Sequence, residues 1–189
     1  MMQFKKHSGI YTLTAEQTIN VPLRKAWDFF SSPENLEKIT PAHMDFKITS
    51  SVDKKAYAGQ IITYKVGVLL GIKSSWVTEI TQVKDKEFFI DEQRFGPYKM
   101  WHHEHWFEEL PNGKTLMKDK ISYKIPFGIL GQFAHSILIK KQLLQIFRYR
   151  EEKLQSLFGH IKGKPNISAT KIPIPMAPVA TPAITSGLP

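Results

Sequence analysis

The C-terminal part of the chain contains a long amphipathic segment, and its length restricts the folds that can accommodate it. From Phe127 to Phe158, apolar residues recur at the spacing of one helical face, which predicts a helix over this range. A helix of about 32 residues is ~48 Å long at a rise of ~1.5 Å per residue. Its apolar stripe is wider than one flat contact can bury, so we expect a concave partner that wraps around it. The stripe contains Ile129, Leu130, Phe133, Ile137, Leu138, Ile139, Leu143, Leu144, Ile146, Phe147, Leu154, Leu157 and Phe158.

The upstream sequence supplies this partner as a series of predicted strands. Seven stretches of alternating apolar and polar residues are separated by turn residues, which indicates hairpin-connected antiparallel neighbours. After the first strand, Pro22 predicts the start of one short helix, and Ser32 with Pro33 predicts a second that ends at Pro41. The order is typical of an α+β fold in which a curved antiparallel sheet wraps around a long C-terminal helix. The predicted strands are Ile10–Val21, Asp45–Val52, Gly59–Val68, Ile72–Val83, Glu87–Phe95, Tyr98–Glu109 and Thr115–Ile125.

The composition indicates one domain followed by a tail. A chain of 189 residues with 42% hydrophobic content can bury a sizeable core, and we assign this domain to residues 1–160. Residues 161–189 are rich in proline and contain no acidic residue, a composition that predicts a disordered tail. No apolar run reaches the ~18 residues needed to cross a bilayer, and the N-terminus lacks a signal-peptide pattern. With no cysteine, disulfides and thiol chemistry are excluded, and we expect a cytoplasmic protein.

The net charge of +9 raises the question of a polyanionic partner. Lys140, Lys141, Arg148 and Arg150 place positive charge on the predicted helix. Such a surplus suits nucleic acid or peripheral contact with an anionic membrane surface. Because the positive residues are scattered along the chain, we interpret them as the solvated face of a helix and expect no nucleic-acid partner. No pattern indicates an oligomeric state.

Several polar residues fall on the strand face that is expected to contact the helix. Side chains alternate along a strand, so each predicted strand can be divided into two faces. Burying so many polar groups is costly unless they bond to one another, to water or to a ligand. Two interpretations therefore stay open, a satisfied network that fixes strand register and a polar anchor for a ligand. The residues are Asp91, Gln93, His103, His105, Asp119 and Tyr123.

A metal interpretation rests on two histidines at alternate positions of one strand. His103 and His105 could share an ion with a carboxylate. Together with Gly96, Glu109 and Gly113 they come near the cupin metal signature, but the spacing departs from it and the long final helix is foreign to that barrel. We predict no metal and no cofactor.

Catalytic motifs of the common enzyme classes are missing from the sequence. There is no Gly-x-Ser-x-Gly, no P-loop and no Gly-x-Gly-x-x-Gly, so hydrolase, NTPase and dinucleotide-dependent functions lack support. The candidates for acid–base chemistry are His103, His105, Asp91 and Asp119.

A set of short motifs occurs in a fixed order over residues 10–158. They are Asn35-Leu-Glu-Lys-Ile-Thr-Pro41, Gly59 with Ile62-Thr-Tyr64, Trp76-Val-Thr-Glu-Ile80, Asp91-x-Gln93-x-x-Gly96-Pro-Tyr98-x-x-Trp101-x-His103-x-His105-x-Phe107, Asp119 with Tyr123, Pro126-Phe-Gly128, and Ile146-Phe-x-Tyr-Arg150. In these motifs the chain resembles the SRPBCC superfamily, also called START-like, and within it a group of small bacterial ligand-binding SRPBCC domain proteins. The resemblance implies a helix-grip fold, with a curved seven-stranded antiparallel sheet around the C-terminal helix. It also implies a cavity for a hydrophobic molecule such as a lipid, a quinone or a polyketide-like compound.

Three functions follow as hypotheses. The first is binding of a small, largely hydrophobic ligand between sheet and helix. The second is an enzyme of the cyclase or dehydratase type, with a histidine as general base oriented by Asp91 or Asp119. The third is an interaction protein that acts through its basic helix and tail. For the first, the apolar walls would be Tyr64, Trp76, Phe89, Trp101, Phe107 and Phe133, and the polar anchor would be Asp91, Gln93, His103, His105, Asp119 and Tyr123.

Overall fold

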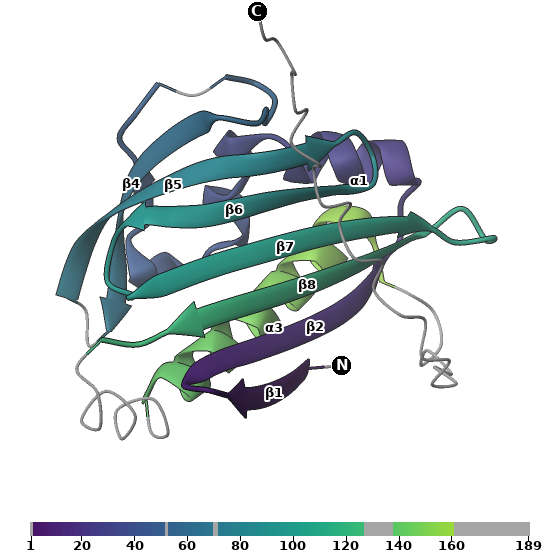
Figure 1. Cartoon of the computed structure of the whole chain (residues 1–189). Coiled ribbons are helices and arrows are strands. Elements are labelled where there is room, and N and C mark those ends of the chain that lie inside the picture. Colours follow the sequence, from purple (N-terminus) through teal and green to yellow (C-terminus); the bar gives the residue numbers. More distant parts are fainter. Residues whose placement is uncertain (1, 52, 70–71, 127–137, 161–189) are drawn as a thin grey trace, which may run out of the picture.

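The computed structural model describes residues 2–51, 53–69, 72–126 and 138–160. Within them, an antiparallel sheet of eight strands, in the order β1-β2-β8-β7-β6-β5-β4-β3, curves around a C-terminal helix (Figure 1). Every neighbouring pair in this order is antiparallel, as the hairpin connections predict. The strands are β1 (Met2–His7), β2 (Ile10–Ile19), β3 (Lys47–Ile48), β4 (Gln60–Leu69), β5 (Ile72–Lys84), β6 (Phe88–Phe95), β7 (Met100–Glu109) and β8 (Thr115–Lys124).

The strand count differs from the predicted seven because the chain begins with an additional edge strand. β1 pairs with β2 through a tight turn at Ser8 and Gly9, whose φ angles are 50° and 77°. Positive φ at both central residues is what a type I′ hairpin turn requires. At the opposite edge, the described residues of the predicted strand Asp45–Val52 form only the two-residue β3. The strand starts late because Asp45 ends the preceding turn in a left-handed conformation, and beyond Ile48 the N–H groups of Thr49 and Ser50 both point to Thr63 O.

The connection from β2 to β3 contains one helix and three short 3-10 turns. α1 (Leu23–Phe30) confirms the first predicted helix and begins directly after Pro22. The second predicted helix begins at Pro33 as expected, but it is of the 3-10 type and is divided at Leu36 into η1 (Pro33–Asn35) and η2 (Glu37–Ile39). A third short turn, η3 (Ala42–Met44), follows. The Ser32 side chain makes no capping hydrogen bond. Local side chains bind backbone carbonyls instead, with Thr40 Oγ1 donating to Leu36 O at 2.7 Å, and such bonds compete with regular helix.

α3 (Lys140–Phe158) lies across the concave face of the sheet (Figure 1). The predicted start of this helix at Phe127 lies outside the described residues. The buried positions follow intervals of four, three and four residues, which place them on one helical face. Two positions differ from the predicted stripe, since Leu157 is 44% exposed and Arg150 is buried. The buried residues of α3 are Leu143, Phe147, Arg150 and Leu154.

α1 closes one end of the space between the sheet and α3. Trp27 packs edge-on against Phe89 and Phe107, with ring centroids 6.1 and 5.5 Å apart. Thr115 Oγ1, which is fully buried, donates to Val21 O at 2.8 Å and ties β8 to the start of α1. α1 is therefore held against the sheet by both apolar and polar contacts.

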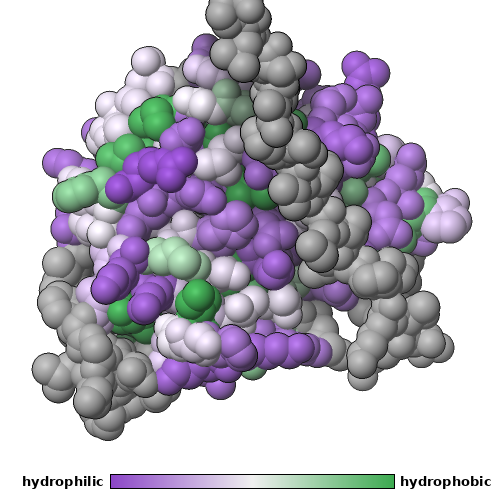
Figure 2. Space-filling view, in the orientation of Figure 1, coloured by the Kyte–Doolittle hydropathy of each residue, from purple (hydrophilic) through white to green (hydrophobic). Residues whose placement is uncertain are grey.

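The outer face of the sheet is largely hydrophilic. Figure 2 views the molecule from this side and shows hydrophobic residues only in small, separate patches. None of the helices formed by the described residues has the length and apolar character that a membrane crossing needs.

Candidate functional site

A cavity of about 210 Å³ lies between β4–β7, the α1–β3 connection and α3. Its wall takes residues from all three hydrophobic clusters of the domain, including Ile80, Leu143 and Val66. Much of this wall is aromatic, which suits a flat apolar molecule because rings pack well face to face or edge to face. The aromatic lining residues are Phe29, Phe30, Phe46, Tyr64, Trp76, Phe89, Tyr98, Trp101 and Phe147.

One side of the cavity carries a cluster of ionisable groups, which we call the charged cluster: Asp91, His103, His105, Asp119 and Arg150. The two histidines face inward because they are alternate residues of β7. Strand register places Asp91 of β6 opposite His103 and Asp119 of β8 opposite His105. The two imidazole rings lie against each other, with centroids 3.7 Å apart. Arg150 reaches the cluster from α3.

Each imidazole contacts both carboxylates. His105 Nε2 lies 2.7 Å from Asp91 Oδ2, and His103 Nε2 lies 3.0 Å from Asp119 Oδ1. Their other ring nitrogens lie near the opposite carboxylate, at 3.6 Å for His103 Nδ1 and 3.0 Å for His105 Nδ1. The second of these contacts is too poorly aligned to be a hydrogen bond. Arg150 Nη1 donates to Asp119 Oδ1 at 3.2 Å.

Burial and mutual attraction set the protonation of the charged cluster. Burial opposes ionisation of both carboxyl groups, but Arg150 and the histidines outweigh it and hold the pKa values of Asp119 and Asp91 below their usual range. Burial, with the nearby charge of His105, lowers the pKa of His103. Burial acts on His105 as well, but its contacts with both carboxylates outweigh it and raise its pKa. With a proton on His105, two positive and two negative charges balance.

Three members of the charged cluster are the described residues that could hold a metal ion. One ligand atom from each of Asp91, His103 and His105 lies within 4.8 Å of the others. Imidazole and carboxylate ligands suit zinc and related ions. These side chains already have partners, since His105 bonds Asp91 and His103 bonds Asp119, and Arg150 adds a positive charge 3.2 Å from Asp119. The cluster therefore reaches neutrality through its own side chains, and the prediction of no metal stays a prediction.

The structure brings seven of the twelve predicted ligand-binding residues to the cavity wall. Asp119 lies behind the histidines, Phe107 packs against Phe30 at 5.5 Å, and Tyr123 stacks on Tyr11 at 5.6 Å, all outside the lining. Phe133 lies outside the described residues. The seven that line the cavity are Tyr64, Trp76, Phe89, Asp91, Trp101, His103 and His105.

Gln93, which we predicted as part of the polar anchor, does not line the cavity. Its side-chain amide binds the backbone of Tyr98, with Nε2 donating to the carbonyl at 2.6 Å and Oε1 accepting from the N–H at 3.2 Å. These two bonds close the β6–β7 turn. A Cβ atom at Gly96 would lie 2.5 Å from Gln93 Oε1, so a larger residue there would have to displace this side chain. Gln93 is thus a turn residue.

Arg150 is the main site residue that sequence reasoning missed, since we interpreted it as part of a basic surface. Its position contained a signal: it falls three residues after Phe147 and four before Leu154, on the buried face of α3. The α1–β3 connection was missed as well, although Ser31 and Phe46 line the cavity. Its irregular turns carry no periodicity from which an inward face could be predicted.

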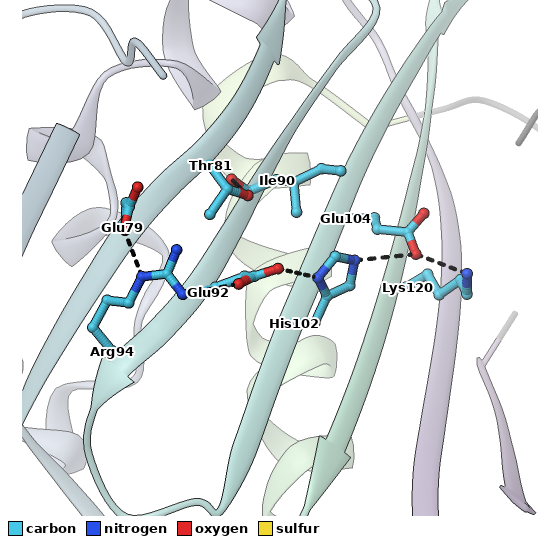
Figure 3. Close-up of polar contacts among 8 residues, drawn as sticks. All are labelled: Glu79, Thr81, Ile90, Glu92, Arg94, His102, Glu104 and Lys120. Atoms are coloured by element: carbon cyan, nitrogen blue, oxygen red, sulfur yellow. Dashed lines mark hydrogen bonds and ion pairs between the residues drawn. The ribbon is translucent and has the colours of Figure 1, made fainter. Parts of the chain in front are cut away.

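The outer face of the same strands carries a separate polar network, shown in Figure 3. His102 directly precedes the inward His103 in sequence and points outward, with Nδ1 2.8 Å from Glu92 and Nε2 3.6 Å from Glu104 (Figure 3). Lys120 bonds Glu104 at 2.7 Å, which links β6, β7 and β8 (Figure 3). This network stabilises strand register on the exposed side and supplies a matched histidine control for the cavity side.

Solved structures of bacterial and plant proteins have a similar fold. A protein from Mycobacterium smegmatis has 17% identity and a TM-score of 0.59, over 83% of this chain and 95% of its own. A protein from Chromobacterium violaceum has 14% identity and a TM-score of 0.60, over 79% and 99%. Ginseng major latex-like protein 151, from Panax ginseng, has 13% identity and a TM-score of 0.59, over 80% and 99%. At these identities the similarity shows the fold alone, which is of the helix-grip type. No protein-family model and no curated protein matches the sequence.

Proposed function

We propose that this protein binds a small, largely hydrophobic molecule in the cavity between the sheet and α3. The observation that carries the proposal is the aromatic cavity of about 210 Å³ with the charged cluster on one side. Small-molecule sites are typically concave and mostly apolar, with a few polar groups that fix orientation. The resemblance of the sequence to ligand-binding SRPBCC domain proteins supports the same function. We also propose that the protein is cytoplasmic and that its ligand-binding domain ends near residue 160.

A matched pair of tryptophan substitutions on β4 tests the binding proposal. Ile62 lines the cavity and is 6% exposed, whereas its neighbour Ile61 is 47% exposed. Ile62→Trp should fill the cavity, at a cost of about 1–3 kcal/mol for overpacking, while Ile61→Trp should leave it open. Native mass spectrometry of gently purified wild type and Ile61→Trp should show a retained mass of a small molecule, and Ile62→Trp should show none. Equal retention by both variants would contradict the proposal.

A second candidate function is proton abstraction by His103, in an enzyme of the cyclase or dehydratase type. The observation that favours it is the bond from His103 Nε2 to Asp119 at 3.0 Å, which leaves Nδ1 as the basic atom of a neutral ring. His103 also lines the cavity, so a bound molecule can lie beside it. An oriented neutral imidazole is suited to removing a proton next to a carbonyl group.

Deuterium exchange distinguishes this enzyme from a binding protein. The methyl protons of 2-acetylnaphthalene lie next to a carbonyl, and their exchange in deuterium oxide is measured by NMR. If His103 abstracts the proton, wild type and His102→Gln should accelerate the exchange and His103→Gln should not. Exchange that is no faster with wild type than without protein would count against catalysis and would leave the binding proposal intact.

The interaction hypothesis has less support from the described residues. Arg150 belongs to the charged cluster, so the exposed face of α3 is less basic than predicted. The proline-rich segment 161–189 lies outside the described residues, and its proposed docking role stays a prediction.

A further inference from the structure

Four of the described residues that line the cavity carry a buried polar atom without a hydrogen-bond partner: Ser31, Trp76, His105 and Arg150. His105 and Arg150 belong to the charged cluster, which leaves Trp76 and Ser31 as the two uncharged donors. Within the described part of the chain, Trp76 Nε1 and Ser31 Oγ are buried and make no hydrogen bond. Both side chains line the cavity, and they are 6% and 2% exposed. An indole N–H can only donate, and a serine hydroxyl donates one hydrogen bond. A buried donor without an acceptor is destabilising, so a molecule that brings an acceptor gains free energy on binding.

The volume of the cavity favours a ligand of one or two rings. An engineered cavity of ~150 Å³ holds one benzene molecule, and the cavity described here measures about 210 Å³. Pockets for drug-sized ligands begin at ~300 Å³. Stacked and edge-on rings at the wall, such as Trp76 with Tyr64 at 5.9 Å and with Trp101 at 5.3 Å, favour a planar molecule. A long acyl chain or a fused four-ring compound exceeds this space.

The charges beside the cavity favour an uncharged ligand. Asp91 lines the wall and remains ionised, because its neighbours hold its pKa below the usual range. The positive charge nearest to it on α3, Arg150, is already bonded to Asp119 at 3.2 Å. Arg150 lines the cavity too, and its Nε has no hydrogen-bond partner, but with His105 protonated the charged cluster is already neutral. An anionic ligand would therefore add a buried negative charge that no further positive charge balances.

From these observations we infer that the ligand is an uncharged, planar molecule of one or two rings that carries a carbonyl or similar acceptor, recognised by at least one of two donors, the N–H of Trp76 and the hydroxyl of Ser31. The inference rests on the proposed binding function and specifies its ligand class. Of the lipids, quinones and polyketide-like compounds considered above, it selects compact aromatic molecules with a hydrogen-bond acceptor.

Three naphthalene derivatives of the same ring size separate the inference from the proposed function. They are 2-acetylnaphthalene, which has a neutral acceptor, 2-ethylnaphthalene, which has none, and 2-naphthoate, which is anionic. Equilibrium dialysis at pH 7.5 with absorbance detection gives the affinity of each. We expect the ketone to bind about threefold to tenfold more tightly than the hydrocarbon, and the anion to bind more weakly than the ketone.

The possible outcomes test the proposed binding function and the inferred ligand class separately. If none of the probes binds, the proposed function fails for molecules of this size. If the hydrocarbon binds as tightly as the ketone, the function stands and the acceptor inference is overturned, because water already serves the donors. If the naphthoate binds most tightly, the requirement for an uncharged ligand is overturned.

Variants of the two donors test which groups recognise the acceptor. Trp76→Phe keeps a ring and removes the N–H, and Ser31→Ala removes only the hydroxyl. The ratio of ketone affinity to hydrocarbon affinity should fall toward one in at least one of them, whereas Trp106→Phe, on the outer face, should leave the ratio unchanged. Because the ratio compares two ligands on the same variant, a general loss of packing weakens both affinities and cancels in the ratio. A ratio that is unchanged in both donor variants would overturn the assignment.

Discussion

Removing the guanidinium of Arg150 should destabilise the protein by about 3 kcal/mol. Arg150→Met keeps an unbranched apolar stem near the Phe147 ring and leaves Asp119 without its strongest counter-charge. The two side chains are 9% and 4% exposed and 3.2 Å apart. At an effective dielectric constant of ~20, Coulomb attraction at this distance is ~5 kcal/mol. His103, 3.0 Å from the same oxygen, recovers part of this by taking up a proton. The remaining loss falls at the lower end of the ~3–5 kcal/mol seen when a buried pair is broken.

Urea denaturation at pH 7, followed by circular dichroism, measures this loss. Arg148→Met is the matched control, because Arg148 is exposed on the same helix, and it should change the free energy of unfolding by less than ~0.5 kcal/mol. The double variant Arg150→Met/Asp119→Asn should regain about 2 kcal/mol relative to Arg150→Met, since it removes both buried charges. The account of the charged cluster is refuted if Arg150→Met behaves like Arg148→Met, or if the two substitutions are simply additive.

Three further predictions concern the elements around the site. Glu104→Gln should cost about 1–2 kcal/mol at pH 7, because His102, Lys120 and Trp106 outweigh burial and lower the Glu104 pKa to about 2. This contribution is present above the ordinary pKa of 4.5 and is lost as pH falls toward about 2, so urea midpoints of variant and wild type should converge on acidification. Gly96→Ala should cost about 1–2 kcal/mol by displacing the Gln93 amide from Tyr98, and an unchanged melting temperature would contradict this reading of the turn. Thr115→Val should cost about 1–2 kcal/mol in urea denaturation, because the buried carbonyl of Val21 loses its donor.

The strand phases were predictable from the sequence because one face of the sheet is buried. Along β8, burial alternates strictly from Thr115 through Met117, Asp119, Ile121 and Tyr123, which is the period of two that the sequence shows. The same phase correctly placed His103 and His105 inside. β1 escaped prediction because its pattern is short and Lys-rich, and its pairing with β2 depends on a turn of only two residues.

Local patterns could not identify how the inward side chains combine. Gln93 follows the expected alternation, yet its side-chain amide bonds to the backbone of Tyr98 in the adjoining turn and does not line the cavity. Arg150 belongs to a residue type that is usually exposed, and its burial depends on Asp119, 31 positions away in the chain. The volume of the cavity depends on how rings from four strands, β4–β7, and from α1 and α3 pack, and no periodicity encodes that.

A crystal structure with 2-acetylnaphthalene tests the central claim most directly. The claim is that the space between the sheet and α3 is a ligand site, and it predicts ring density among Tyr64, Trp76 and Phe147, with the carbonyl oxygen within hydrogen-bond distance of Trp76 Nε1 or Ser31 Oγ. Density for the probe only on the outer face of the sheet, or a cavity filled by its own side chains, would contradict the claim.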